Sequence, residues 1–111
     1  MADLDKFIEA FIEAMCWTNE HELGEAELSD EIRLDIAADC RSFWRRFGCY
    51  VEPSHQTPQQ AGHDFWLTRN GHGAGFWDGD WPEPYAEMLT KASESYGPFE
   101  PYMGDDGLIY V

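Results

Sequence analysis

The stretch GHDFWLTRNGHGAGFWDG, residues 62–79, combines four aromatic side chains with five glycines. At its centre, Asn70-Gly71 is the dipeptide most typical of a two-residue type I′ turn, because both central positions of that turn need positive φ. The turn would place Trp66 opposite Gly75 in two antiparallel strands. An indole ring across from a glycine fills the space that the missing side chain leaves. The stretch therefore predicts a β-hairpin.

Three other segments show the periodicity of amphipathic helices. Residues 4–15 and 32–47 carry apolar side chains at i, i+3 and i+4 spacing, and Ser29 is the expected N-cap of the second segment. Residues 85–96 predict a third helix, with Asp80 as its N-cap and the first member of a capping box.

The remaining segments complete the expected fold. EPSHQTPQQAG, residues 52–62, is typical of a loop because it is rich in Pro, Gln and Gly. DDGLIYV, residues 105–111, predicts a turn and a short strand added to the hairpin. The order is helix, helix, strand, strand, helix, strand. We therefore expect a single acidic domain over residues 1–111 of the α+β class, with three helices on one face of a small antiparallel sheet.

Charge is the strongest signal in the composition. The chain has 22 acidic and 7 basic residues, for a formal net charge of −15. Such a field repels nucleic acids and membranes and attracts basic surfaces. Three arginines interrupt it near the end of the second predicted helix: Arg41, Arg45 and Arg46.

Carboxylates recur every four residues along the first two predicted helices. Like charges at this spacing weaken a helix by a few tenths of a kcal/mol per pair, so two such rows suggest a use other than helix stability. Their rise of about 6 Å per step is comparable to the spacing of DNA phosphates, about 3.4 Å per nucleotide. The alternative interpretation is an ordinary solvated face. The rows are Asp5, Glu9 and Glu13, and Glu31, Asp35 and Asp39.

The start of the chain, MADLDKFIEAFIEA, is acidic and amphipathic, unlike the basic, uniformly apolar start of a secretory signal. Three cysteines without a CxxC pair suggest reduced thiols, with buried structural cysteines favoured over a reactive nucleophile. We expect a cytoplasmic protein without a membrane segment.

Candidate catalytic chemistry centres on the predicted hairpin. Arg69 and His72 flank its turn and, with Asp64, could bind an anion or move a proton, or could simply pin the strand register. His63 and His72 would lie at opposite ends of the ribbon, too far apart to share a metal ion. GHGAG, residues 71–75, lacks the spacing of a phosphate-binding loop. We expect neither a cofactor nor a metal.

The segment GHDFWLTRNGHGAGFWD, continued by LTKASESYG and GDDGLIYV, resembles a family of small uncharacterised proteins encoded by tailed bacteriophages. The resemblance covers roughly residues 32–111. It implies a phage origin and expression inside a bacterium, and it implies no activity or catalytic residue. Phages make many proteins that occupy host nucleic-acid-binding or defence proteins, so the resemblance favours a small acidic inhibitor.

Two function hypotheses follow. The first is an acidic binding protein, not an enzyme, that inhibits a basic host protein involved in nucleic-acid handling or defence, with DNA mimicry as one form. The carboxylate rows would steer association and exposed tryptophans would anchor it. The second is a small-ligand-binding or enzymatic domain around Asp64, Arg69 and His72. The partner-binding residues of the first hypothesis are Asp5, Glu9, Glu13, Glu31, Asp35, Asp39, Trp17, Trp66 and Trp77.

Overall fold

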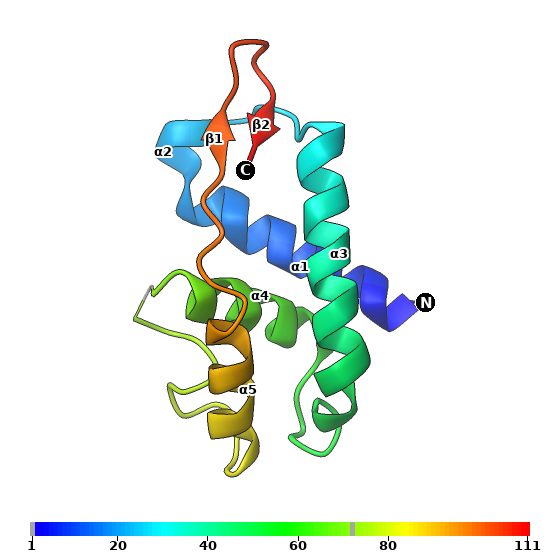
Figure 1. Ribbon diagram of the computed structural model, residues 1–111. Helices are drawn as coiled ribbons and strands as arrows, with labels where there is room; N and C mark the ends of the chain where they lie inside the picture. Colours follow the sequence, from blue (N-terminus) through cyan, green and yellow to red (C-terminus); the bar gives the residue numbers. More distant parts are fainter. Residues whose placement is uncertain (1, 72) are drawn as a thin grey trace.

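The computed structural model describes residues 2–71 and 73–111, and these are mainly helical (Figure 1). The only sheet in this part of the chain is a pair of two-residue strands. The predicted α+β class, with three helices on a sheet, is therefore wrong. The helices are α1 (Ala2–Thr18), α2 (Glu20–Leu23), α3 (Asp30–Phe47), the 3-10 helix η1 (Gly48–Tyr50), α4 (Pro58–Arg69) and α5 (Tyr85–Glu94), and the strands are β1 (Tyr102–Met103) and β2 (Ile109–Tyr110).

The amphipathic pattern located α1 and α3 correctly. Both helices turn toward the core the apolar side chains that the periodicity assigned to their inner faces, and these side chains are buried or partly buried. The Ser29 hydroxyl accepts a hydrogen bond from the Ile32 amide at 3.1 Å, which confirms the predicted N-cap of α3. The α-helix ends at Phe47, directly before Gly48, as expected.

The predicted β-hairpin is wrong, because its first strand is part of helix α4. Thr57 caps this helix by accepting a hydrogen bond from the Gln60 amide at 3.1 Å, and Pro58 occupies its first turn. Asn70 and Gly71 end the helix instead of forming a hairpin turn. Gly71 has φ of 65°, the left-handed conformation common directly after a helix.

The predicted pairing of Trp66 with Gly75 is also wrong. Gly75 packs against Thr68, whose hydroxyl accepts a hydrogen bond from the Phe76 amide at 3.1 Å. This contact ties the loop after α4 back onto the helix. Phe76 is consequently buried in the core, while its neighbour Trp77 is exposed.

Helices α1 and α4 pack closely along their lengths and run in the same direction (Figure 1). Residues early in α1 contact residues early in α4, and residues late in α1 contact residues late in α4. Phe7 lies against Gly62 near the start of both helices, and the Trp66 indole nitrogen donates to the Thr18 hydroxyl at 2.9 Å near their ends. A side chain at Gly62 would collide with the Phe7 carbonyl oxygen. The glycine therefore sets how closely the two helices approach.

Aromatic rings fill the space where α3 and α5 meet this pair. Phe43 of α3 stacks on Phe65 of α4 with ring centroids 4.2 Å apart, and on Phe7 of α1 at 5.8 Å. Tyr96, just after α5, meets Phe65 edge-on at 5.4 Å. Such pairs add to the hydrophobic free energy of burial, so this cluster is the centre of the core.

At the C-terminal end, the third predicted helix is confirmed as α5, whereas its N-cap and the pairing of the terminal strand differ from expectation. Helix α5 begins at Tyr85 rather than after Asp80, and the Glu83 carboxylate accepts the hydrogen bond from the Glu87 amide at its first turn. Asp80 is therefore not an N-cap. The terminal strand β2 pairs with β1 instead of with the predicted hairpin, since that hairpin does not exist.

The β1–β2 hairpin is held at the start of α3. The Ser29 amide donates to the Ile109 carbonyl at 2.9 Å, and the Ile109 amide donates to the Glu27 carbonyl at 2.9 Å. From α5 the chain reaches this hairpin past α4 and α1 (Figure 1), and Phe99 packs edge-on against Phe11 on the way. Residues 95–111, the C-terminal segment, thus connect the end of the molecule that holds α5 with the end where α3 begins.

Candidate functional site

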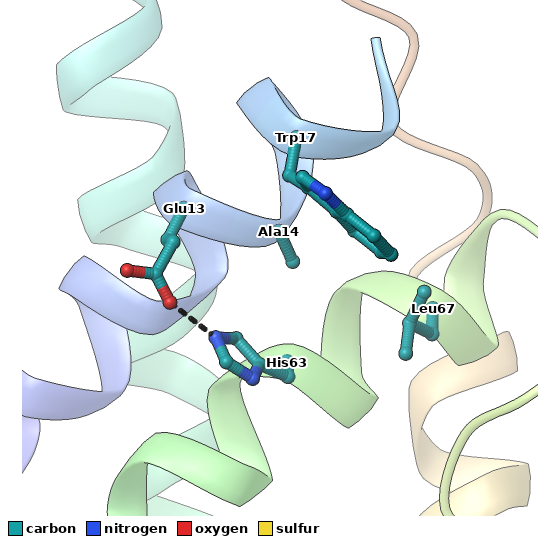
Figure 2. A pocket seen from close by; sticks show the side chains of 5 residues that line it. All are labelled: Glu13, Ala14, Trp17, His63 and Leu67. Carbon is teal, nitrogen blue, oxygen red and sulfur yellow. Dashed lines mark hydrogen bonds and ion pairs between the residues drawn. The ribbon is translucent and has the colours of Figure 1, made fainter. Parts of the chain in front are cut away.

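A pocket of about 460 Å³ lies between α1 and α4. Figure 2 shows the Trp17 indole extending from α1 toward α4, with Glu13 and His63 meeting at the other end. The walls between these ends are apolar. Five side chains line the pocket: Glu13, Ala14 and Trp17 from α1, and His63 and Leu67 from α4.

Trp17 is exposed over 72% of its surface, although it belongs to a helix whose other face is buried. Helical spacing explains this, because Trp17 follows Glu13 by four residues and lies beside the outward carboxylate row. Ala14 is buried beside the indole, and because its side chain is small, space remains between the indole and α4. A large exposed ring beside an apolar hollow is typical of a binding surface.

Glu13 and His63 form the polar end of the pocket. Glu13 Oε1 lies 2.8 Å from His63 Nε2, and the side chains are 73% and 35% exposed. The second Glu13 oxygen points away from His63 (Figure 2). Both partners face water, so this pair contributes little to stability. It leaves the second carboxylate oxygen exposed at the polar end of the pocket, on the side away from Trp17 and Leu67 (Figure 2).

The α1 row of carboxylates lies on the outer side of its helix. Asp5 and Glu9 are exposed, and Glu13 reaches His63. On α3, Glu31 and Asp35 are exposed, whereas Asp39 is partly covered. Each step of four residues overshoots a full helical turn by about 40°, so the α3 row drifts toward the buried face.

Figure 1 shows α1 and α3 crossing each other, so the two rows follow different axes. Arg41, Arg45 and Arg46 form no ion pair with a carboxylate among the residues that the structure describes. Within the same residues, four row members have no cation within ion-pair distance, namely Asp5, Glu9, Glu31 and Asp35.

Asp39 is paired with Arg69, and this pair is structural. Arg69 Nη1 lies 3.0 Å from Asp39 Oδ2, at ion-pair distance but without the alignment of a hydrogen bond. Arg69 Nε donates to the Gly97 carbonyl at 2.8 Å. Burial lowers the pKa of Arg69, and the negative charge of Asp39 opposes that shift. Asp39 therefore holds α3 to α4 instead of facing a partner.

The three tryptophans expected as anchors differ in position. Trp17 lines the pocket and is exposed, and Trp77 is 53% exposed in the loop before α5. Trp66 is buried, with 1% of its surface exposed, between α1 and the C-terminal segment. Its proposed role as an exposed anchor is wrong, because α4 turns it into the core.

The alternative site is not assembled in the described residues. Asp64 is buried and accepts hydrogen bonds from Trp81 Nε1 at 2.6 Å and from Gln60 Nε2 at 3.0 Å. Burial raises the pKa of Asp64, and these two hydrogen bonds oppose the shift. Arg69 has its own partners, as described above. His72 lies outside the described residues.

Sequence reasoning missed His63 and Leu67 as members of the site. They are four residues apart, so they share one face of α4 once that segment is recognised as a helix. The sequence did contain the signal for the helix, since Thr57-Pro58 followed by Gln60 is a capping box with proline in the first turn.

Comparison of the chain with protein-family models, with curated proteins and with solved structures finds no match. In residues 2–71 and 73–111, no helix is both long and apolar enough to cross a membrane. The same residues contain no group of three or more His, Cys, Asp or Glu side chains placed to hold a metal ion.

Proposed function

We propose that this protein is an acidic binding domain that occupies the nucleic-acid-binding surface of a basic host protein. The observation that carries the proposal is the set of four exposed carboxylates on α1 and α3 that form no ion pair in the described residues, on a chain of net charge −15. Unpaired charges of one sign draw an oppositely charged partner and raise the rate of association.

The partner class follows from the sign of the charge. A protein surface that binds nucleic acid is rich in Lys and Arg, because it must neutralise phosphates. The same surface complements rows of carboxylates. The setting we propose is the cytoplasm of a phage-infected bacterium, given the resemblance of residues 32–111 to phage proteins, and the outcome is inhibition of the host protein.

Capture from bacterial lysate tests the proposal. The immobilised protein is expected to retain basic nucleic-acid-binding proteins at low salt, and to release them at high salt or when duplex DNA is added as a competitor. Retention that depends on neither salt nor competing DNA would contradict the proposal. An interaction between surface charges is screened by salt, and duplex DNA would compete for the same basic surface.

Two variants of equal charge provide the matched control. The first neutralises the helix rows (Asp5→Asn, Glu9→Gln, Glu31→Gln and Asp35→Asn). The second neutralises four exposed acids elsewhere (Glu25→Gln, Glu52→Gln, Glu94→Gln and Glu100→Gln). Association with a captured partner should slow about tenfold or more in the first and much less in the second. Equal slowing would show that net charge matters and the rows do not.

A further inference from the structure

The pocket between α1 and α4 has two chemically different ends. Trp17 and Leu67 provide an apolar wall, and Ala14 lies below them. The opposite end presents the Glu13 carboxylate, which is held at one oxygen by His63 and accessible at the other. An occupant that satisfies both ends must combine an apolar group with a cation.

Several occupants are possible in principle, and charge separates them. A second copy of this chain brings another −15, so self-association across this acidic face is repelled. A purely apolar small molecule would leave the accessible Glu13 oxygen unused. A basic protein segment that carries an apolar side chain uses the wall, the carboxylate and the surrounding field together.

We propose that this pocket seats one apolar side chain of the basic partner, with an adjacent Lys or Arg bound to Glu13. The inference rests on the proposed function for the basic character of the partner, and it adds the residue pattern that the partner presents. The carboxylate rows attract the segment, and the Trp17 pocket supplies the desolvated anchor. His63 fixes the position of the carboxylate by its contact with Oε1.

The size of the pocket supports an anchor of aromatic size. Its volume of about 460 Å³ falls within the roughly 300–1,000 Å³ of pockets that bind small ligands. Burying a Phe side chain contributes about 1.5–3 kcal/mol, which corresponds to roughly tenfold or more in affinity. Removing that side chain should therefore cost about a factor of ten.

Three synthetic peptides test the inference by NMR titration of the intact protein. The first has one Phe flanked on each side by two Arg, the second replaces Phe with Ala, and the third replaces every Arg with Glu. The first should shift the resonances of Ala14, Trp17 and Leu67 and bind about tenfold more tightly than the second. The third should not bind.

Protein variants then locate the contact. Trp17→Ala should remove the preference for Phe over Ala, whereas Leu34→Ala, at a side chain 71% exposed on α3, should leave it intact. Glu13→Gln should weaken binding of the first peptide and reduce its salt dependence. Trp17, Leu34 and Glu13 are all exposed, so each variant is expected to fold, and circular dichroism checks this.

The outcomes separate this inference from the proposed function. If both Arg peptides bind equally and in a salt-sensitive way, the pocket does not anchor the partner, but the proposal of a basic partner is retained. If the Phe peptide with Glu binds as well as that with Arg, the requirement for a cation is wrong, and the basic partner fails with it. If neither Arg peptide binds even at low salt, both proposals are contradicted.

Discussion

Arg69 places a positive charge inside an aromatic cluster. Its guanidinium carbon lies 5.1–5.9 Å from the centroids of four rings. A buried charge is tolerated only when it is paired and hydrogen-bonded, so Asp39 and the backbone carbonyls of Tyr96 and Gly97 offset the cost of burying Arg69. The four rings belong to Phe11, Phe65, Tyr96 and Phe99.

Asp39→Asn should lower the free energy of unfolding by about 1–3 kcal/mol, because Arg69 loses its counter-charge in a buried environment. Partial exposure of Asp39 favours the lower half of that range. The matched control is Asp35→Asn in the same row, which should stay within about 0.5 kcal/mol of the parent. Urea denaturation measures both, and equal effects would show that the Asp39–Arg69 pair is dispensable.

Asp64 predicts a pH dependence of stability. Burial raises its pKa in the folded protein above the unfolded value, so the folded state binds this proton more tightly. The stabilisation from the proton is full below the unfolded pKa and is lost as pH rises through the folded pKa. Asp64→Asn keeps an oxygen acceptor without the charge, so its stability relative to the parent should increase across that window and then stay constant.

The control for this prediction is Asp64→Ala, which leaves the Trp81 indole N–H without its acceptor. An unpaired buried donor costs about 1–3 kcal/mol. Urea denaturation at a series of pH values compares the three proteins. A constant difference between the Asn variant and the parent at all pH values would contradict the assigned pKa direction.

At the scale of elements, Gly62 controls the approach of α1 and α4. Gly62→Ala would force its methyl group against the Phe7 carbonyl and the Ala10 side chain, so the helices must separate. Overpacking of this kind costs about 1–3 kcal/mol. Gln59→Ala, on an exposed position of α4, is the control and should change stability little. Thermal unfolding compares the two, and a neutral Gly62→Ala would mean that the helices can separate without cost.

Helix α4 also explains how far the sequence predicts the fold. Helices α1 and α3 each bury one face, so their periodicity identified them. Helix α4 is buried on most sides, including Asp64, Trp66 and Arg69, and therefore shows no clear stripe. The Asn70-Gly71 dipeptide then favoured a hairpin, although a glycine of positive φ also follows helices. Burial of this segment against the rest of the protein stabilises the helix over the predicted hairpin.

The candidate site was predicted in part for the same reason. Glu13 and Trp17 belong to α1, whose exposed side the periodicity identified, and the structure places both at one pocket. His63 and Leu67 belong to α4, but this segment was predicted as part of a β-hairpin, so these side chains were not expected to face α1. The pairing of Asp39 with Arg69 joins residues far apart in the chain, which spacing along a single helix does not reveal.

At the scale of the whole molecule, the net charge of −15 predicts that salt stabilises the fold. Raising NaCl from about 10 mM to about 1 M shortens the screening length from about 30 Å to about 3 Å, so self-repulsion is largely removed. The midpoint of thermal unfolding should rise by about 4 °C or more for each kcal/mol of repulsion relieved.

The variant with Asp5→Asn, Glu9→Gln, Glu31→Gln and Asp35→Asn is the control for the salt effect. It carries four fewer negative charges, so part of the salt-dependent rise in the unfolding midpoint should be absent. An identical rise in the parent and in the variant would assign the effect to general salting-out of apolar surface rather than to charge.

The shared direction of α1 and α4 has a consequence for how the chain acquires its structure. Two helices that run the same way cannot be joined by a short turn, and here contacting residues are 48 and 50 positions apart. Closing so long a loop is slow, so refolding in a stopped-flow experiment should take milliseconds or longer, unlike bundles built from adjacent helices. During translation, α3 can cover only part of the apolar side of α1, and the part that packs on α4 stays uncovered until α4 has left the ribosome.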